Sequence, residues 1–145
     1  MHVTVSKEVQ FDAGHRVPDH ASKCRNPHGH RYRVVAHVGG VVQVAPGTSE
    51  DGMVVDFGVI KALLTDLIHD RWDHGFIVAY TDTVMKQALA AGDDWHVVVE
   101  DYVPTAENLA AHCATLLTAP LAERGLTLEA VEVWETPTSC ARWDR

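Results

Sequence analysis

Polar and apolar residues alternate along two segments near the start of the chain. The first covers residues 3–13 and the second covers residues 28–44. Alternation is typical of strands that bury one face, because successive side chains of a strand point to opposite sides. His15 follows the first segment with the parity of Ala13, so its imidazole would project from the apolar face. The pattern predicts two long strands, with a histidine at the end of the first.

Apolar residues with helical spacing follow in two further segments. Asp56 can cap the first predicted helix, whose apolar positions are Phe57, Ile60, Leu63, Leu64, Leu67 and Ile68. Thr105 can cap the second, and Glu107 in its first turn faces the positive end of the helix dipole. Gly125 would end this helix, and Pro120 would kink or interrupt it. Two main helices are expected.

The remaining segments complete a fold of the α+β class. Residues 82–91 fit a short helix, residues 96–103 fit a short extended segment, and residues 127–135 and 140–143 fit a closing hairpin. Strands, then helices, then strands predict an antiparallel four-stranded sheet with the two main helices on one face, in a single domain over residues 1–145. Such a sheet has two open edges. Open edges are usually blunted or paired, so self-association is expected.

Composition narrows the class of protein. With 145 residues, 46% of them hydrophobic, the chain resembles one globular domain. No apolar run approaches the ~20 residues of a membrane span, and the first residues lack the apolar core of a signal peptide. Three cysteines, an odd and sparse set, favour a cytoplasmic protein with reduced thiols. A net charge of −8 argues against a general nucleic-acid binder.

Cations nevertheless gather in one part of this acidic chain. Five of them lie within 18 residues that contain a single acid, Asp19, and we call them the basic stretch: Arg16, Lys23, Arg25, Arg31 and Arg33. One interpretation is a solvated basic patch, and the other is a local anion site. The pattern alone leaves both open.

The segment from Cys24 to His30 is the most informative about chemistry. His28 and His30 are two residues apart on a predicted strand, so both imidazoles point to one side. His15, at the end of the neighbouring strand, can supply a third nitrogen. Three imidazoles without a fourth protein ligand describe a catalytic zinc site with an open position. Two alternatives stay open: the histidines are ordinary surface or core residues, or Cys24 is a fourth ligand that closes a structural site.

Two further positions place carboxylates where they could act. Asp73 precedes His74 after the first helix, and a turn can aim this pair at one pocket, where histidine is the usual proton shuttle near neutral pH. A turn aspartate beside a surface histidine is the alternative. Glu135 ends a strand with the parity of its apolar residues, where a carboxylate is costly unless paired. It either joins a buried network or anchors a ligand that offers donors.

Six short motifs occur in an order that resembles a known family. They are Phe11-Asp-Ala-Gly-His15, Cys24-x3-His28-Gly-His30, Met53-Val-Val-Asp56-Phe57, Trp72-Asp73-His74, Pro104-Thr105-Ala-Glu107-Asn108 and Trp134-Glu135-Thr136. Together they span nearly the whole chain and resemble the 6-pyruvoyl- and 6-carboxytetrahydropterin synthases. The spacing from Cys24 to His28 is similar to that of the carboxy branch, because the pyruvoyl branch of animals has a longer gap there.

The resemblance implies a metal and several residue roles. It implies that Zn2+ is bound by His15, His28 and His30. It also implies that Cys24 transfers protons rather than binding the metal, and that His74, supported by Asp73, is the acid–base partner. The pterin ring would be anchored by Glu135, and it would be further held by Thr105, Ala106 and Glu107.

The implied fold is the tunnelling fold, in which subunits pair their sheet edges into a barrel, usually a homohexamer of two trimers. The implied activity is a zinc-dependent lyase that converts 7,8-dihydroneopterin triphosphate to 6-carboxy-5,6,7,8-tetrahydropterin, acetaldehyde and triphosphate, in 7-deazapurine biosynthesis of the queuosine type. The basic stretch is the candidate for the triphosphate. The alternatives are the same fold making 6-pyruvoyltetrahydropterin, and a non-catalytic zinc protein with Cys24 as fourth ligand.

Overall fold

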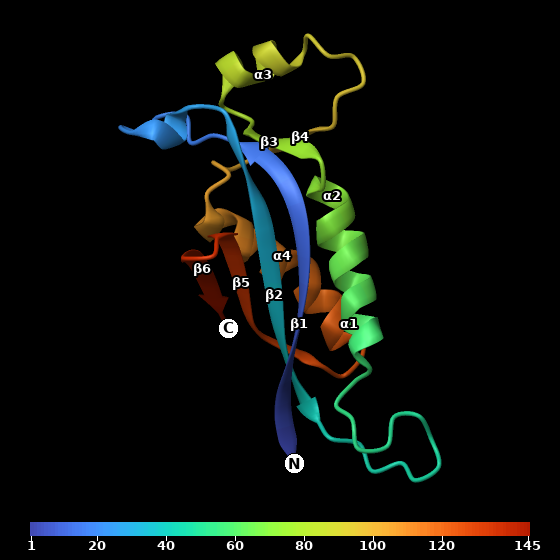
Figure 1. Ribbon diagram of the computed structural model, residues 1–145. Coiled ribbons are helices and arrows are strands. Elements are labelled where there is room, and N and C mark those ends of the chain that lie inside the picture. The colour runs from blue at the N-terminus through green and yellow to red at the C-terminus, as the bar shows by residue number, and fades with distance from the viewer.

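Two long antiparallel strands form the centre of the fold (Figure 1). In the computed structural model, which describes residues 1–145, β1 (His2–His15) pairs with β2 (His28–Val41) along its whole length. The ladder runs from His2 opposite Val41 to His15 opposite His28. The structure confirms both predicted strands, although β2 ends at Val41 rather than at residue 44, because β1 begins at His2 and offers few further partners.

The sheet has six strands and is mixed, so the expectation of four antiparallel strands is wrong. Its order is β4-β3-β1-β2-β5-β6. β5 (Thr127–Thr136) and β6 (Ser139–Asp144) form the predicted closing hairpin beside β2. β3 (Gly75–Ala79) runs parallel to β1, and β4 (Val97–Glu100) runs parallel to β3.

β3 and the parallel pairing of β3 with β4 escape prediction for a physical reason. The segment that forms β3 is short and apolar without alternation, and such a run does not distinguish a strand from part of a buried helix. The expected extended segment at residues 96–103 does contain β4. Its pairing with β3, however, depends on a crossover connection, in which α3 (Thr83–Leu89) lies at the predicted place.

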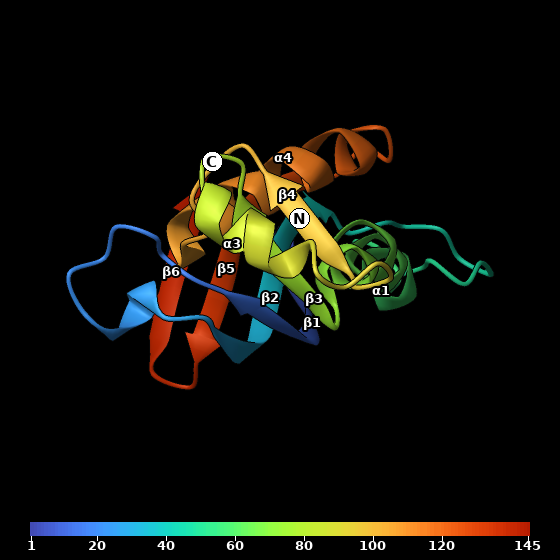
Figure 2. The same ribbon diagram turned by 90° about the horizontal axis from the view of Figure 1, so that it is seen from above.

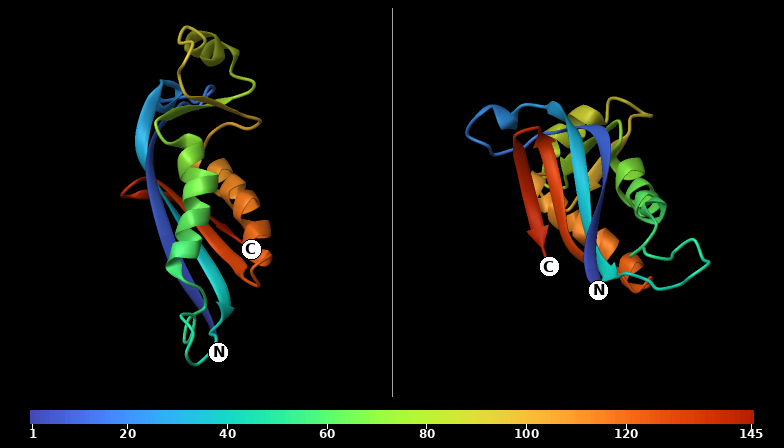
Figure 3. Two further views of the ribbon diagram at one scale, coloured as in Figure 1. Left: turned by 90° about the vertical axis from the view of Figure 1, so that its right-hand side faces the viewer. Right: turned by 60° about the horizontal axis from the view of Figure 1, so that its bottom comes forward.

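Two helical columns cover one face of the sheet (Figure 3). The first is continuous through α1 (Phe57–Leu64), the π-helical turn η2 (Thr65–His69) and α2 (Asp70–Trp72), and so extends past the predicted apolar positions. The second is α4 (Ala106–Ala122). It runs past Pro120 without the predicted interruption, because the proline lies in its last turn. None of the helices has the length and hydropathy that crossing a membrane requires.

The predicted caps are present at both columns. The Asp56 side chain accepts a hydrogen bond from the backbone N–H of Gly58 at 2.5 Å, and the Thr105 hydroxyl accepts one from Asn108 at 3.3 Å. These bonds satisfy N–H groups that a helix start leaves without partners. Gly125 follows α4 with a φ of 72°, the left-handed conformation that commonly ends helices. Local sequence therefore sets where α4 starts and ends.

The inner face of the sheet and the two columns enclose one hydrophobic core of 22 buried residues. Leu64, Trp72 and Leu117 of the helices and Tyr32 of β2 are all completely buried there. The opposite face of the sheet, which we call the open face, carries ion pairs between neighbouring strands: Arg31 with Asp12, Arg33 with Glu8 and Arg142 with Glu132.

One end of the molecule collects the irregular segments. The loop between β1 and β2, which contains the short 3-10 helix η1 (Lys23–Arg25), and α3 both lie at the end of the sheet where β1 finishes (Figure 2). A paired contact joins them, because the guanidinium of Arg16 donates to both carboxylate oxygens of Asp82, at 2.6 and 2.5 Å. This end of the molecule holds the candidate site.

We expect replacement of Leu117 by alanine to lower the free energy of unfolding by about 2–5 kcal/mol, because it empties a completely buried position between α4 and the sheet. Urea denaturation measures the change. Thr115→Ala on the exposed side of the same helix is the control and should change the value by less than about 0.5 kcal/mol. Equal losses in the two variants would contradict this packing.

Candidate metal centre

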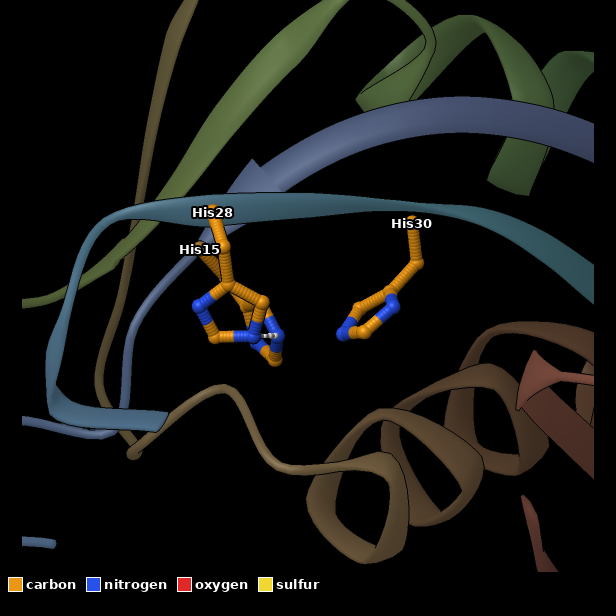
Figure 4. A group of neighbouring side chains, drawn as sticks. All are labelled: His15, His28 and His30. Carbon is orange, nitrogen blue, oxygen red and sulfur yellow. Dashed lines mark hydrogen bonds between the residues drawn. The ribbon is translucent and has the colours of Figure 1, made fainter. Parts of the chain in front are cut away.

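Three histidines converge at the end of the β1–β2 ladder. His15 stands directly opposite His28, and Ala13 stands opposite His30. Residues opposite each other in a ladder share a face, as do residues two apart on one strand, so all three imidazoles project from the inner face. Figure 4 shows the three rings pointing toward one another from the two strands. The predicted convergence of His15, His28 and His30 is therefore present in the fold.

Hydrogen bonds determine where two of the rings carry their protons. Nδ1 of His15 lies 2.7 Å from the carbonyl oxygen of Pro104, and Nδ1 of His28 lies 2.6 Å from the carbonyl oxygen of Asn26. A carbonyl oxygen can only accept, so each Nδ1 carries a proton and donates it. In the neutral rings the lone pair is then on Nε2. Backbone carbonyls of this kind commonly orient metal-binding histidines.

The distances between the rings fit a metal ion. The Nε2 atoms of His15 and His28 are 3.1 Å apart, and two lone pairs facing each other at this distance repel. Nitrogens that each lie about 2.0–2.1 Å from a tetrahedral metal are about 3.3 Å apart, so a cation between them would remove the repulsion. The ligand atoms of all three histidines lie within 4.8 Å of one another, and this ligand group does not include Cys24.

Burial keeps the ligands in the form that a metal needs. It lowers the pKa of His15 to about 4; the hydrogen bond to Pro104 opposes this decrease, while His28 and His30 add to it. Burial, with the proximity of His28, also lowers the pKa of His30. Metal ligands have to be deprotonated, so protons hardly compete for His15 at neutral pH.

Two hollows meet at the histidine cluster. The α4 hollow, about 320 Å³, lies between the cluster and the start of α4 and is lined by Thr105, Ala106 and Glu107. The loop hollow, about 590 Å³, lies beside the β1–β2 loop and is lined by Lys23 and Asn26. Both share a common wall formed by Cys24, His28, Glu135 and Ser139. The predicted pterin-binding residues and Cys24 therefore surround one continuous space.

Glu135 faces the cluster from β5, as its parity predicts. Its carboxylate lies 3.8 Å from Nε2 of His15, and its side chain is 24% exposed. Burial raises the pKa of Glu135, and the nearby carboxylate of Glu107 adds to the increase. The structure gives this carboxylate no hydrogen-bond donor. The carboxylate therefore keeps its capacity to accept hydrogen bonds.

Asp73 and His74 form the expected pair but not beside Cys24. His74 Nδ1–H donates to Asp73 at 2.7 Å, and this hydrogen bond raises the pKa of His74. Asp73 in turn accepts from the backbone N–H of Asp12 at 3.1 Å. His74 lines a separate hollow with Asp12 and Arg31, on the side of the open face, and its side chain is 80% exposed. Of the clustered histidines only His30 also lines this hollow, and neither Cys24 nor Glu135 reaches it.

The backbone at this pair is unusual. His74 has a φ of 57°, the left-handed region, which costs a residue other than glycine roughly 1–2 kcal/mol. The conformation turns the chain from α2 into β3, and the His74 N–H donates to the Asp12 carbonyl at 2.7 Å. Such strained positions often occur at functional sites.

Three residues of the α4 hollow were not among the predicted site residues. His20, Ser139 and Cys140 line it together with Cys24. His20 comes from the β1–β2 loop, where its Nδ1 accepts a hydrogen bond from the backbone N–H of Ser22 at 2.9 Å. None of the three lies in a recognisable motif, and only the folding of the loop and of the β5–β6 turn around the cluster brings them in.

Comparisons with known proteins identify the family. A model of the family described as 6-pyruvoyl tetrahydropterin synthase matches residues 4–145. The 6-carboxy-5,6,7,8-tetrahydropterin synthase of Synechocystis is 36% identical over 140 residues, 96% of this chain and 91% of that protein. The protein of the same name from Rickettsia bellii is 34% identical over 136 residues, 93% of this chain and 95% of that protein.

Solved structures support the fold. An uncharacterized protein of Wolinella succinogenes superposes with a TM-score of 0.83 at 24% identity, covering 100% of this chain and 99% of its own. The 6-pyruvoyl tetrahydropterin synthase of Caenorhabditis elegans superposes with a TM-score of 0.71 at 23% identity, covering 100% of this chain and 96% of its own. At these identities the likeness concerns the fold alone.

We expect the purified protein to contain about one divalent metal ion per chain, and the double variant His28→Ala, His30→Ala to lose it, because two of three ligands are removed. Elemental analysis by mass spectrometry measures the content. His20→Ala removes a histidine outside the ligand group and should keep the metal. Full retention of metal by the double variant would disprove the site.

Proposed function

Because this chain belongs to the 6-pyruvoyl tetrahydropterin synthase family, we propose that it is a zinc-dependent 6-carboxytetrahydropterin synthase. Family membership makes it an enzyme of pterin metabolism, a lyase. The observation that carries the finer assignment is a cluster of three histidines that shares its hollow with Cys24. The substrates are 7,8-dihydroneopterin triphosphate and one water molecule. The products are 6-carboxy-5,6,7,8-tetrahydropterin, acetaldehyde and triphosphate, on a route to 7-deazapurines of the queuosine type.

The histidine cluster is the zinc site of this proposal. Nε2 of His15 and of His28 carries the lone pair that binds the ion, since the Nδ1 protons are held by carbonyl oxygens. His30 supplies the third nitrogen. When bound, zinc supplies Lewis-acid stabilisation of the negative charge that develops on substrate oxygen as a carbon-bound proton moves. The position without a protein ligand leaves room for the substrate.

Cys24 is the proton-transfer residue of this proposal. It lines both hollows beside His28 but lies outside the group of ligand atoms. A thiol in this position can take or return the proton of a substrate carbon without occupying the metal. The arrangement supports an open catalytic site over a closed structural site in which Cys24 would be a fourth ligand.

The pterin ring binds in the α4 hollow. Glu135 accepts hydrogen bonds from the N–H and amino groups of the ring, which present two donors in the geometry that a carboxylate accepts. This pairing gives a donor to a carboxylate that has none within the chain. Backbone groups of Thr105 and Ala106, at the capped start of α4, and the neighbouring Glu107 line the same hollow and hold the ring.

The acid–base pair reaches the site through assembly. Asp73 and His74 belong to the open face of their own chain, so in this proposal they serve the hollow of a neighbouring subunit. The raised pKa of His74 favours its protonated form as a proton donor. The outer strands β4 and β6 give the sheet two edges, which subunits can pair. A homohexamer of two trimers, closed into a barrel, is the proposed assembly.

Product analysis tests the activity. Incubation with 7,8-dihydroneopterin triphosphate should release acetaldehyde and 6-carboxy-5,6,7,8-tetrahydropterin, detected by derivatisation and mass spectrometry. Cys24→Ala should retain zinc and lose roughly 10²–10⁴-fold in rate, the usual contribution of a positioned acid or base. A 6-pyruvoyl product without acetaldehyde would assign the other branch of the family. Loss of zinc together with activity would make Cys24 a ligand.

Mixed oligomers test the shared site. Cys24→Ala and His74→Ala chains should each be inactive alone, but their co-expression should restore activity to about a quarter of wild type, because random assembly unites an intact Cys24 with an intact His74 in that share of sites. Size-exclusion chromatography with light scattering confirms mixing. Mixed oligomers without recovered activity would place both residues in the site of a single chain.

A further inference from the structure

The two hollows that meet at the histidine cluster differ in charge. The α4 hollow has the carboxylates of Glu107 and Glu135 in its lining and no lysine or arginine. The loop hollow has Glu135 as its single carboxylate and contains a cation, Lys23. Neutral polar side chains, those of Asn26, Thr136 and Ser139, also line the loop hollow, beside Cys24, His28 and His30. The two carboxylates of the α4 hollow repel a polyanion, whereas Lys23 attracts it to the loop hollow.

Three cations of the basic stretch form ion pairs with carboxylates: Arg16, Arg31 and Arg33. The guanidinium of Arg16 binds both oxygens of Asp82, at 2.6 and 2.5 Å, in a contact buried on the carboxylate side. On the open face, Arg31 binds Asp12 at 3.0 and 2.9 Å. Bidentate pairs of this kind are among the strong hydrogen bonds of proteins, so neither guanidinium is free for a ligand.

Two members of the stretch have no carboxylate partner, Lys23 and Arg25. Arg25 donates to the carbonyl oxygen of Ala21 at 3.4 Å and lines neither hollow. Arg33 binds Glu8 at 3.1 Å and lies over the ring of Trp134, again on the open face. Lys23 is therefore the one lysine or arginine of this chain that combines an uncommitted charge with a place in the site.

We propose that the loop hollow is the subsite for the phosphate chain of the substrate, with Lys23 as its cation and Asn26, Thr136 and Ser139 as neutral donors. The inference rests on the proposed function. A substrate with its pterin ring in the α4 hollow crosses the shared wall at Cys24 and His28, where the chemistry occurs. Its phosphates then lie in the loop hollow, which at about 590 Å³ is the larger of the two.

Titration calorimetry with inorganic triphosphate tests this subsite on the zinc-loaded protein. Lys23→Gln should weaken triphosphate binding roughly tenfold, as the loss of a charge-assisted hydrogen bond does. Arg25→Gln removes the same charge two residues away and should weaken binding less than about twofold, since a surface charge outside the hollow is screened. The difference in triphosphate affinity between wild type and Lys23→Gln should shrink as the salt concentration is raised. Because triphosphate itself binds zinc, the metal content of each protein is measured after titration and has to be equal.

Either of two results overturns the subsite. One is equal triphosphate affinity in wild type and Lys23→Gln. The other is an equal loss of affinity in Lys23→Gln and Arg25→Gln, which would indicate that the overall charge of the loop, rather than Lys23 itself, attracts the anion. Dihydroneopterin, the ligand without phosphates, separates this failure from that of the proposed function. It should bind wild type and Lys23→Gln alike. Wild-type protein that does not bind dihydroneopterin would contradict the pterin site, whereas the triphosphate titration tests the subsite by itself.

Discussion

The register of the β1–β2 ladder is the constraint on which the site depends. His15 stands opposite His28 only because fourteen consecutive residues of each strand pair without a bulge. Side chains alternate between faces, so a shift by one residue would move His28 and His30 to the open face and carry buried apolar residues with them. The apolar core beneath the cluster, with Tyr32 and Val34 completely buried, therefore holds the metal ligands in place. Stability and site geometry have the same origin here.

The cluster is also tied to the start of α4. The carbonyl that orients His15 belongs to Pro104, just before the Thr105 cap. That connection is held in turn by Asn108, whose side-chain amide donates to the Val103 carbonyl at 2.9 Å. One short segment thus fixes the tautomer of a buried ligand on one side and the lining of the α4 hollow on the other. A bound ring and the metal ligands are held by the same backbone.

The sheet divides chemistry between its two faces. The inner face carries the histidine cluster at the edge of the core, with His15 buried, whereas the open face carries ion pairs and the exposed Asp73–His74 pair. In the proposed enzyme Cys24 and the Asp73–His74 pair meet only where two chains come together. The edge strands β4 and β6 can pair one chain with the next. A site built across copies in this way would exist only in the assembled protein.

Local patterns in the sequence were enough to predict β1 and β2, the caps at Asp56 and Thr105, and the shared face of the three histidines. Strand alternation has a period of two residues and each cap bond spans two or three, so neighbouring positions along the chain determine these features.

Only the tertiary structure decided the rest. The parallel strands β3 and β4 depend on a crossover that no local pattern encodes, and it is this addition that places Asp73 and His74 beside Asp12 on the open face. The basic stretch appeared in the sequence as one group of like charges. The fold separates its members, because the carboxylate that binds Arg16 is 66 residues away. Which charges are paired and which are free depends on contacts between distant segments, and alternation along a strand carries no information about them.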